Sequence, residues 1–187
     1  MEQRVAPITI DSATEDTVAK VLVSGCINGP GIRFNGTSVE VKSPIWDRWE
    51  SEGRLFPFCA ELASGFAVPR PPAELVGGTA SEVFSGAATV LEATGNNVTD
   101  QFIDGARRAV EYAVERGCVA AVLTDGSPSC GSTYVYDGNF AGGTQAGTGV
   151  VAQLLLDHGI AVFSETQLRQ ADEYIRATEP KNPTSRP

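Results

Sequence analysis

The stretch Cys118-Val119-Ala120-Ala121-Val122-Leu123-Thr124 is an uninterrupted apolar run, typical of a strand that is buried on both faces of a sheet. A strongly amphipathic helix is predicted directly before it, starting at residues 97–100 and ending at Gly117. Its apolar face consists of Phe102, Ile103, Ala106, Val110 and Ala113. A long amphipathic helix that leads into a buried strand indicates a βαβ unit, and hence a parallel sheet.

The same alternation continues on both sides of this strand. Further strands are predicted at residues 19–23, 54–58 and 160–163. Further helices are predicted to begin at Ser43-Pro44, to cover residues 147–157 and to run from Ser164-Glu165 to about Arg176. The predicted fold class is α/β: a single-domain, three-layer α/β/α arrangement with a mostly parallel, Rossmann-like sheet.

The chain has 187 residues, of which 42% are hydrophobic, enough for one well-buried core. We expect an N-terminal arm at residues 1–17, one α/β domain at residues 18–177 and a disordered tail at residues 178–187. Residues 65–78 are rich in Pro and Gly and are predicted to form a long functional loop.

A net charge of −9 and a pI near 4.6 argue against binding to a nucleic-acid backbone, which needs a basic face. The sequence has no secretory n-region and no apolar run near the roughly 20 residues that span a bilayer, so we expect no membrane association and a cytoplasmic location. The four cysteines are therefore expected to be reduced thiols. Nothing in the sequence indicates an oligomeric state.

Three cysteines follow predicted strands: Cys26 after the first, Cys59 after the second, and Cys130 after the run at residues 118–124. The carboxyl ends of parallel strands converge on one crevice, so three thiolates could meet there. Thiolates select zinc, copper(I) or an iron–sulfur cluster, and a cubane held by only three cysteines leaves one iron open. The ordinary alternative is that these cysteines are small buried hydrophobes. Cys118 fits that alternative best, since it begins a strand.

Three further side chains are candidates for chemistry. Glu61, two residues after Cys59, could be a general acid or base, or a first-turn glutamate that complements a helix dipole. Ser127 and Ser129 could direct their hydroxyls into the crevice, or could cap a turn.

Two other features are weaker signals. The glycine-rich turn at residues 25–31 lacks both the G-x-G-x-x-G pattern and a P-loop lysine, so it does not by itself indicate phosphate binding. His158 is expected to be a cation at a helix end rather than a catalyst.

With these residues in view, the chain closely resembles a family of small bacterial proteins, long known only as a domain of unknown function, whose characterised members are thiouracil desulfidases. The resemblance runs from about Lys20 to the final helix. Beside the three cysteine segments, it includes residues 32–36 (Ile-Arg-Phe-Asn-Gly), 68–71 (Val-Pro-Arg-Pro), 76–78 (Val-Gly-Gly), 127–131 (Ser-Pro-Ser-Cys-Gly), 136–138 (Tyr-Asp-Gly) and 159–165 (Gly-Ile-Ala-Val-Phe-Ser-Glu).

The resemblance implies a [4Fe–4S] cluster ligated by Cys26, Cys59 and Cys130, with one iron that has no protein ligand. It implies that a thiolated pyrimidine such as 2-thiouracil places its sulfur on that iron, that water attacks the polarised carbon, and that the oxo base and hydrogen sulfide are released. Glu61 would handle the proton of the water, while Ser127, or less favourably Ser129, would orient the substrate or assist proton transfer.

The chain departs from the family pattern in two places. Cys59-Ala60-Glu61 replaces the usual Cys-Pro-Glu, and a lysine common upstream of Ser-Pro-Ser-Cys is replaced within Thr124-Asp125-Gly126. If Asp125 points inward, it disfavours an anionic thionucleotide, and a neutral thiobase is then expected.

Two other function classes use the same cysteines. A non-catalytic metal-binding or redox-sensing module would be favoured if Cys118 or His158 closed the metal site as a fourth ligand. A disulfide oxidoreductase is less well supported, because the sequence has no C-x-x-C pair.

Overall fold

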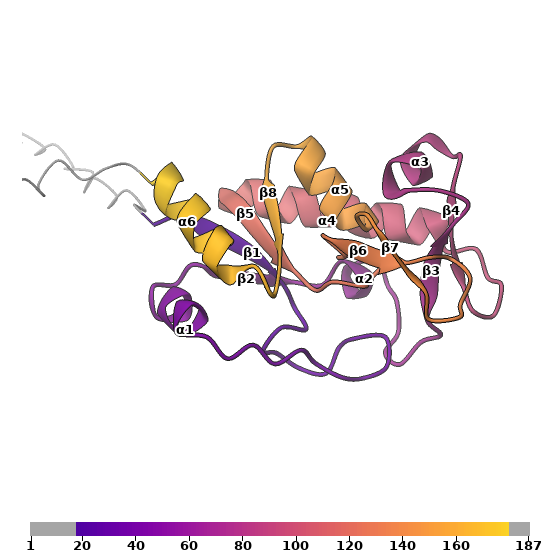
Figure 1. Cartoon of the computed structure of the whole chain (residues 1–187), viewed down its shortest axis with the longest axis horizontal. Helices are drawn as coiled ribbons and strands as arrows, with labels where there is room; N and C mark the ends of the chain where they lie inside the picture. Colours follow the sequence, from indigo (N-terminus) through magenta and orange to yellow (C-terminus); the bar gives the residue numbers. More distant parts are fainter. Residues whose placement is uncertain (1–17, 180–187) are drawn as a thin grey trace, which may run out of the picture.

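The computed structural model describes residues 18–179 and contains a four-stranded parallel sheet (Figure 1). Its strands are β1 (Lys20–Ser24), β2 (Leu55–Phe58), β5 (Cys118–Leu123) and β8 (Ala161–Ser164), in the spatial order β2-β1-β5-β8. All three strand pairs are parallel, so the predicted α/β class is confirmed. The two most apolar strands, β1 and β5, are central, as the burial of both of their faces requires.

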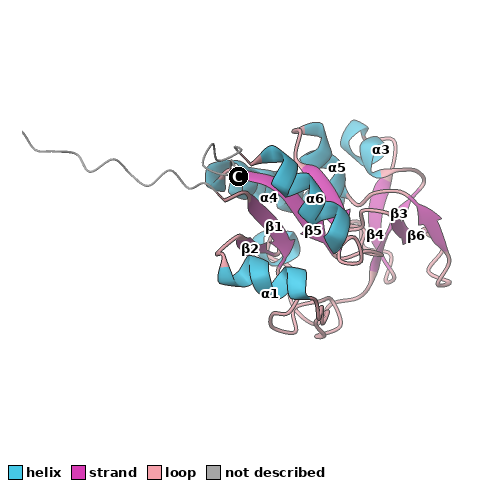
Figure 2. Ribbon diagram, turned by 60° about the vertical axis from the view of Figure 1, so that its left-hand side comes forward, coloured by secondary structure: helices cyan, strands magenta, loops and turns pink. Residues whose placement is uncertain are grey.

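Helices cover both faces of the sheet (Figure 2). On one face, α1 (Pro44–Ser51) and α6 (Leu168–Thr178) pack over Val21 and Val23 of β1. On the other face, the core that includes Leu22 is built from α2 (Ala60–Ala63), α4 (Thr99–Arg116) and α5 (Val150–Asp157). Successive residues of a strand point to opposite faces, so the sequence Val-Leu-Val supplies both cores of the predicted three-layer arrangement.

The predicted start of a helix at Ser43-Pro44 is correct, whereas the predicted start at Ser164-Glu165 is wrong. Ser43 caps α1 by accepting the N–H of Ile45 at 3.2 Å, with Pro44 in the first turn, as predicted. The last helix instead begins at Leu168, after Gln167. Ser164 closes β8 and its hydroxyl pairs with Thr166, so this serine was wrongly taken as a cap because strand and helix signals overlap there.

Two small antiparallel hairpins were missed by the sequence analysis. One pairs β3 (Ala73–Val76) with β4 (Thr89–Glu92) around the short helix α3 (Ala80–Ser85), and the other pairs β6 (Tyr134–Tyr136) with β7 (Thr144–Ala146). They lie near one another, away from α1 and α6 (Figure 2). The predicted loop at residues 65–78 therefore contains the whole of β3, which was overlooked because strands of three or four residues carry almost no periodic signal.

The predicted N-terminal arm at residues 1–17 lies outside the described residues, as does the tail from residue 180 onward. Helix α6 continues to Thr178, and the next residue, Glu179, pairs with Arg54 and accepts the N–H of Ala19 at 3.0 Å. Within residues 18–179, no helix is long and apolar enough to cross a membrane.

A nearly buried carboxylate joins α6 to α1. Asp172 accepts hydrogen bonds from Trp49 Nε1 at 2.9 Å and from Arg48, and it forms an ion pair with Arg176, whose Nε lies 3.0 Å from Oδ2. Burial alone would raise the pKa of Asp172, but the Trp49 and Arg48 contacts outweigh it and lower this pKa below its usual value of 3.8.

We expect Asp172→Asn to reduce the free energy of unfolding at pH 7 by about 2 kcal/mol, the usual magnitude for hydrogen bonds to a charged group. Because the folded-state pKa is lowered, the carboxylate stabilises the fold above pH 3.8 and loses this effect as the pH falls below that value. Urea denaturation at several pH values should therefore show the deficit of the variant shrinking in acid. Asp157→Asn, an exposed control that accepts a hydrogen bond from Gln153 at 2.9 Å, should change stability little. A deficit for Asp172→Asn that is equal at pH 3 and pH 7 would contradict this account.

Candidate functional site

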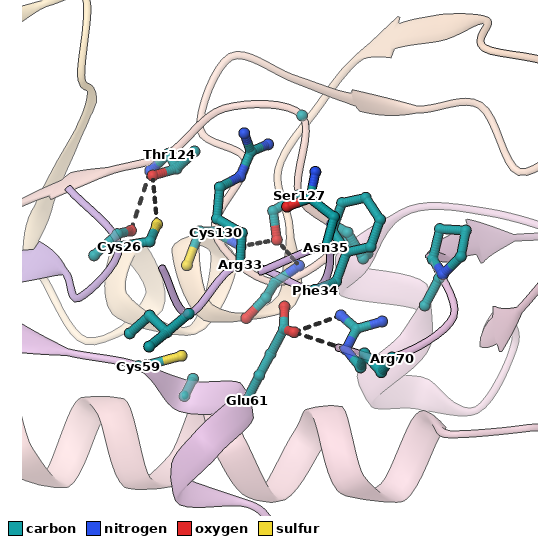
Figure 3. A pocket seen from close by; sticks show the side chains of 18 of the residues that line it. Cys26, Arg33, Phe34, Asn35, Cys59, Glu61, Arg70, Thr124, Ser127 and Cys130 are labelled. Atoms are coloured by element: carbon teal, nitrogen blue, oxygen red, sulfur yellow. Dashed lines mark hydrogen bonds and ion pairs between the residues drawn. The ribbon is translucent and has the colours of Figure 1, made fainter. Parts of the chain in front are cut away.

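A cavity of about 490 Å³ opens at the carboxyl edge of the sheet (Figure 3). This is where ligands bind in open parallel sheets, and the volume lies within the usual range for small-molecule sites. The cavity is lined by the loop after β1, by the end of β2 and the start of α2, and by the loop after β5. Residues between 70 and 74 and Tyr136 of β6 also line it. Among the lining residues are Cys26, Arg33, Phe34, Cys59, Glu61, Arg70, Thr124, Ser127, Ser129, Cys130 and Tyr136.

The three cysteines predicted to meet do line this one cavity, and all are free thiols. Cys26 follows the end of β1 by two residues, and Cys59 directly follows β2. Cys130 comes from the longer loop after β5. Parallel pairing of β2 with β1 and of β1 with β5 is what brings these three chain segments to the same edge.

Close packing of two helices fixes the position of Cys59, which is the residue before α2. A side chain at Gly105 of α4 would place its Cβ only 2.6 Å from the carbonyl oxygen of Ala60. The glycine therefore lets the first turn of α2 lie directly on α4, and this contact holds the segment that carries Cys59.

The loop that carries Cys130 is held from both ends. The Ser127 hydroxyl oxygen accepts the N–H groups of Ser129 at 3.0 Å and of Cys130 at 3.2 Å. The first N–H groups of α5 donate to the same loop, from Val150 to the Pro128 carbonyl and from Val151 to the Ser129 carbonyl, both at 2.9 Å. Ser127 thus caps a turn and lines the cavity as well, whereas Ser129 lines it while only 1% exposed.

Each of the three sulfur atoms lies beside hydrogen-bond donors. Burial raises the pKa of all three thiols, but nearby groups oppose the rise: the Thr124 hydroxyl at Cys26 and the Ser24 hydroxyl at Cys130. At Cys59 the backbone N–H groups of Leu62 and Glu61 oppose the increase in pKa, although neither makes a capping hydrogen bond of normal geometry. A metal would displace the thiol protons, and these donors would then face thiolates.

The side chains that gather at the cavity indicate which kind of metal group it could hold. Within the described chain, no three His, Cys, Asp or Glu side chains are arranged to hold a single metal ion. The three thiols line one cavity, and thiolates are the ligands that hold iron–sulfur clusters.

Neither proposed fourth ligand lines the cavity. Cys118 begins β5, at the opposite edge of the sheet, where burial raises its pKa to about 11. His158 ends α5, where its Nδ1 lies 2.8 Å from the Leu154 carbonyl oxygen. The closed metal site that would favour a purely structural role is therefore not formed by these two residues.

Glu61 is held by an arginine that the sequence analysis did not single out. Arg70 donates to Glu61 Oε2 from Nε at 2.9 Å and also from Nη2 (Figure 3). The Arg70 side chain is only 6% exposed, and its guanidinium lies 4.9–5.9 Å from the ring centres of Phe34, Phe66 and Phe102. Both donors bind the same carboxylate oxygen, so Oε1 of Glu61 is left for other partners.

Asp125 does not line the cavity. A neutral substrate was expected only if this side chain pointed inward, and that condition is not met. Its carboxylate accepts the backbone N–H groups of Ser132 at 2.7 Å and of Thr133 at 2.9 Å, together with both hydroxyls. Arg33 and Arg70 both line the cavity. The electrostatic reason for disfavouring an anionic substrate therefore disappears.

Arg33 and Arg70 are the functional candidates that sequence reasoning missed. Both lie in segments that carry the family resemblance, residues 32–36 and 68–71. Residues 32–36 lie well inside the long loop after β1, and residues 68–71 lie between α2 and β3, so a search limited to the residues just after a strand could not find them.

Three free thiols and an arginine-bound carboxylate, gathered at the carboxyl edge of a parallel sheet, define a candidate site for an enzyme with a thiolate-ligated cofactor. Comparison with known proteins identifies the family: the model for 2-thiouracil desulfurase matches residues 21–167. The chain belongs to this family, and membership supports its assignment as a desulfidase enzyme.

Two relatives are similar over most of the chain. An uncharacterised Bacillus subtilis (strain 168) protein, YbbK, is 39% identical over 148 residues, which cover 79% of this chain and 97% of that protein. The solved structure of TudS, a [4Fe–4S]-dependent thiouracil desulfidase, is also 39% identical and has a TM-score of 0.77. That match covers 85% of this chain and 99% of the TudS chain.

We expect Asp125→Ala to loosen the loop that carries Cys130, because it leaves the N–H groups of Ser132 and Thr133 without their acceptor. The cost should be about 1–3 kcal/mol of unfolding free energy, with faster amide hydrogen exchange at residues 131–134. Asp137→Ala, which removes an acceptor for only the N–H of Asn139, is the matched control and should have a smaller effect. Unchanged exchange at residues 131–134 in Asp125→Ala would contradict this role.

Proposed function

We propose that the protein desulfurates a thiolated pyrimidine, represented by 2-thiouracil, and releases the oxo base and hydrogen sulfide. The cofactor would be a [4Fe–4S] cluster held by Cys26, Cys59 and Cys130. The observation that carries this proposal is the convergence of three free thiols on one cavity, to which the described chain contributes no other cysteine and no histidine. With three protein ligands, one iron would have none.

When bound, the cluster would supply a Lewis acid that polarises the C=S bond and accepts the departing sulfur. The reaction exchanges sulfur for oxygen: water and the thiocarbonyl become a carbonyl and hydrogen sulfide, with no net oxidation or reduction. The protein therefore has to bind a flat heterocycle, position one water molecule and move its protons. Aromatic rings suited to such a heterocycle line the cavity, namely Phe34, Phe58 and Tyr136.

Glu61 is the group that would take the proton from the attacking water. Its carboxylate lines the cavity, and both Arg70 donors bind Oε2, which leaves Oε1 to face the water. Arg70 would act as a positioning residue, because its own guanidinium is confined by three aromatic rings and cannot easily change direction.

Ser127 would donate a hydrogen bond to the substrate. Its oxygen already accepts two backbone N–H groups, so its own hydroxyl proton is left to point into the cavity. Ser129 also lines the cavity but is more deeply buried, and it is the less favoured of the two for substrate orientation.

The direct test is anaerobic purification, cluster reconstitution and assay of hydrogen sulfide and uracil released from 2-thiouracil. We expect Cys26→Ala, Cys59→Ala and Cys130→Ala each to lose most of the bound iron and sulfide together with turnover. Cys118→Ala is the matched control and should keep both, because Cys118 does not line the cavity. A full cluster in Cys130→Ala would rule out the proposed ligation, whereas a full wild-type cluster without turnover would favour the metal-binding or sensing module.

We expect Glu61→Gln to keep the cluster but to reduce kcat by about 10²–10⁴-fold, the usual contribution of a general acid or base. Arg70→Met should also reduce kcat with the cluster intact, because the Glu61 carboxylate would lose both donors to Oε2. Glu111→Gln, on an exposed part of α4, is the control and should behave as wild type. Full turnover by a cluster-loaded Glu61→Gln variant would assign the proton transfer to another group.

A further inference from the structure

The hydroxyl of Thr124 lies against one of the three proposed cluster ligands. Thr124 directly follows β5 and is 4% exposed, and its Oγ1 lies 3.3 Å from Cys26 Sγ (Figure 3). Its backbone N–H donates to the Ser24 hydroxyl oxygen at 3.1 Å, and Ser24 is itself 2% exposed. The ends of β1 and β5 are thus joined by two hydroxyl groups beside the cavity.

The protonation state of the cysteine decides which atom donates. Either atom can donate while Cys26 is a thiol, but a cysteine that ligates iron is a thiolate and has no proton. Within residues 18–179, the Thr124 hydroxyl has no hydrogen-bond partner other than Cys26. Once Cys26 is deprotonated, the bond can only run from the Thr124 hydroxyl to the sulfur.

Ser24 is arranged in a related way. Its oxygen accepts the Thr124 N–H, which leaves its hydroxyl proton for another acceptor. Thr124 takes part in both contacts: its hydroxyl lies beside Cys26 Sγ, and its backbone N–H donates to the Ser24 hydroxyl oxygen.

We propose that Thr124 donates an O–H···S hydrogen bond to the Cys26 thiolate and thereby sets the reduction potential and the Lewis acidity of the bound cluster. A donor to a ligand sulfur withdraws electron density that the sulfur would otherwise give to iron, which makes the cluster easier to reduce and a stronger electrophile. This inference rests on the cluster of the proposed function. Thr124 is a positioning and tuning residue, since it acts through Cys26.

The Thr124 hydroxyl is not needed to hold β5 in place. The backbone N–H of Thr124 still binds Ser24 when the side chain is changed, and β5 is paired on both sides by β1 and β8. Valine has nearly the same shape as threonine but no donor, so Thr124→Val isolates the hydrogen bond. Thr124→Ser restores the donor in a smaller side chain.

The test is an anaerobic redox titration of the reconstituted clusters, followed by electron paramagnetic resonance at equal iron content. We expect a more negative midpoint potential in Thr124→Val, a value close to wild type in Thr124→Ser, and no change in the control Thr89→Val, which lies on β4 and does not line the cavity. An unchanged potential in a fully loaded Thr124→Val variant would overturn the proposal.

A second measurement keeps the proposal testable if the Thr124→Val variant assembles no cluster. The Fe–S(Cys) stretching frequencies of the wild-type cluster should shift when exchangeable protons are replaced by deuterium, and the shift should be smaller in Thr124→Ala. No deuterium shift in the wild-type protein would overturn the proposal. A wild-type protein that assembles no cluster would instead overturn the proposed function itself, so the two failures are distinguishable.

Discussion

Parallel pairing of β2, β1 and β5 is the constraint on which the rest of the structure depends. Parallel strands all end at the same edge, so whatever residue follows each strand is delivered to one crevice. Val21, Leu22 and Val23 stabilise that pairing by packing into the cores on both faces of the sheet. Burial of the apolar strands therefore brings the three thiols to one edge, and the hydrogen bonds of the loop after β5 then hold Cys130 in place.

Burial that secures the fold works against ionisation of the cysteines. Besides desolvation, repulsion from Glu61 raises the pKa of Cys26, and repulsion from Cys26, Glu61 and Cys59 raises the pKa of Cys130, while Arg33 opposes the increase in the pKa of Cys26. Such a group of acids is stable as anions only with added positive charge, and iron ions would provide it. The same repulsion acts on the Glu61 carboxylate, and its ion pair with Arg70 offsets it. The Arg70 guanidinium is buried beside the Phe66 ring.

The central sheet, both helical layers and the meeting of the three cysteines could be predicted from the sequence, because long apolar runs and the residues after them are local signals. The ion pair between Glu61 and Arg70 could not, since it joins segments whose approach depends on the short strand β3 and on packing against Phe66 and Phe102. The orientation of Asp125 stayed a condition for a related reason. Its carboxylate accepts the N–H groups of Ser132 and Thr133, a turn that the sequence does not reveal.

Cys59 directly follows β2 and Glu61 lies two residues further on in α2, so one proposed ligand and the proposed proton acceptor are on consecutive elements. The strand ends of the rigid sheet present the cysteines, whose spacing must not vary if a cluster is to fit. The carboxylate proposed to accept the proton belongs to α2, and its guanidinium partner comes from the segment that leads into β3. Because β5 continues directly into Thr124, the hydroxyl that would adjust the cluster belongs with the ligands and not with the acid–base pair. Cluster electronics and proton transfer can consequently be altered by separate substitutions in this site.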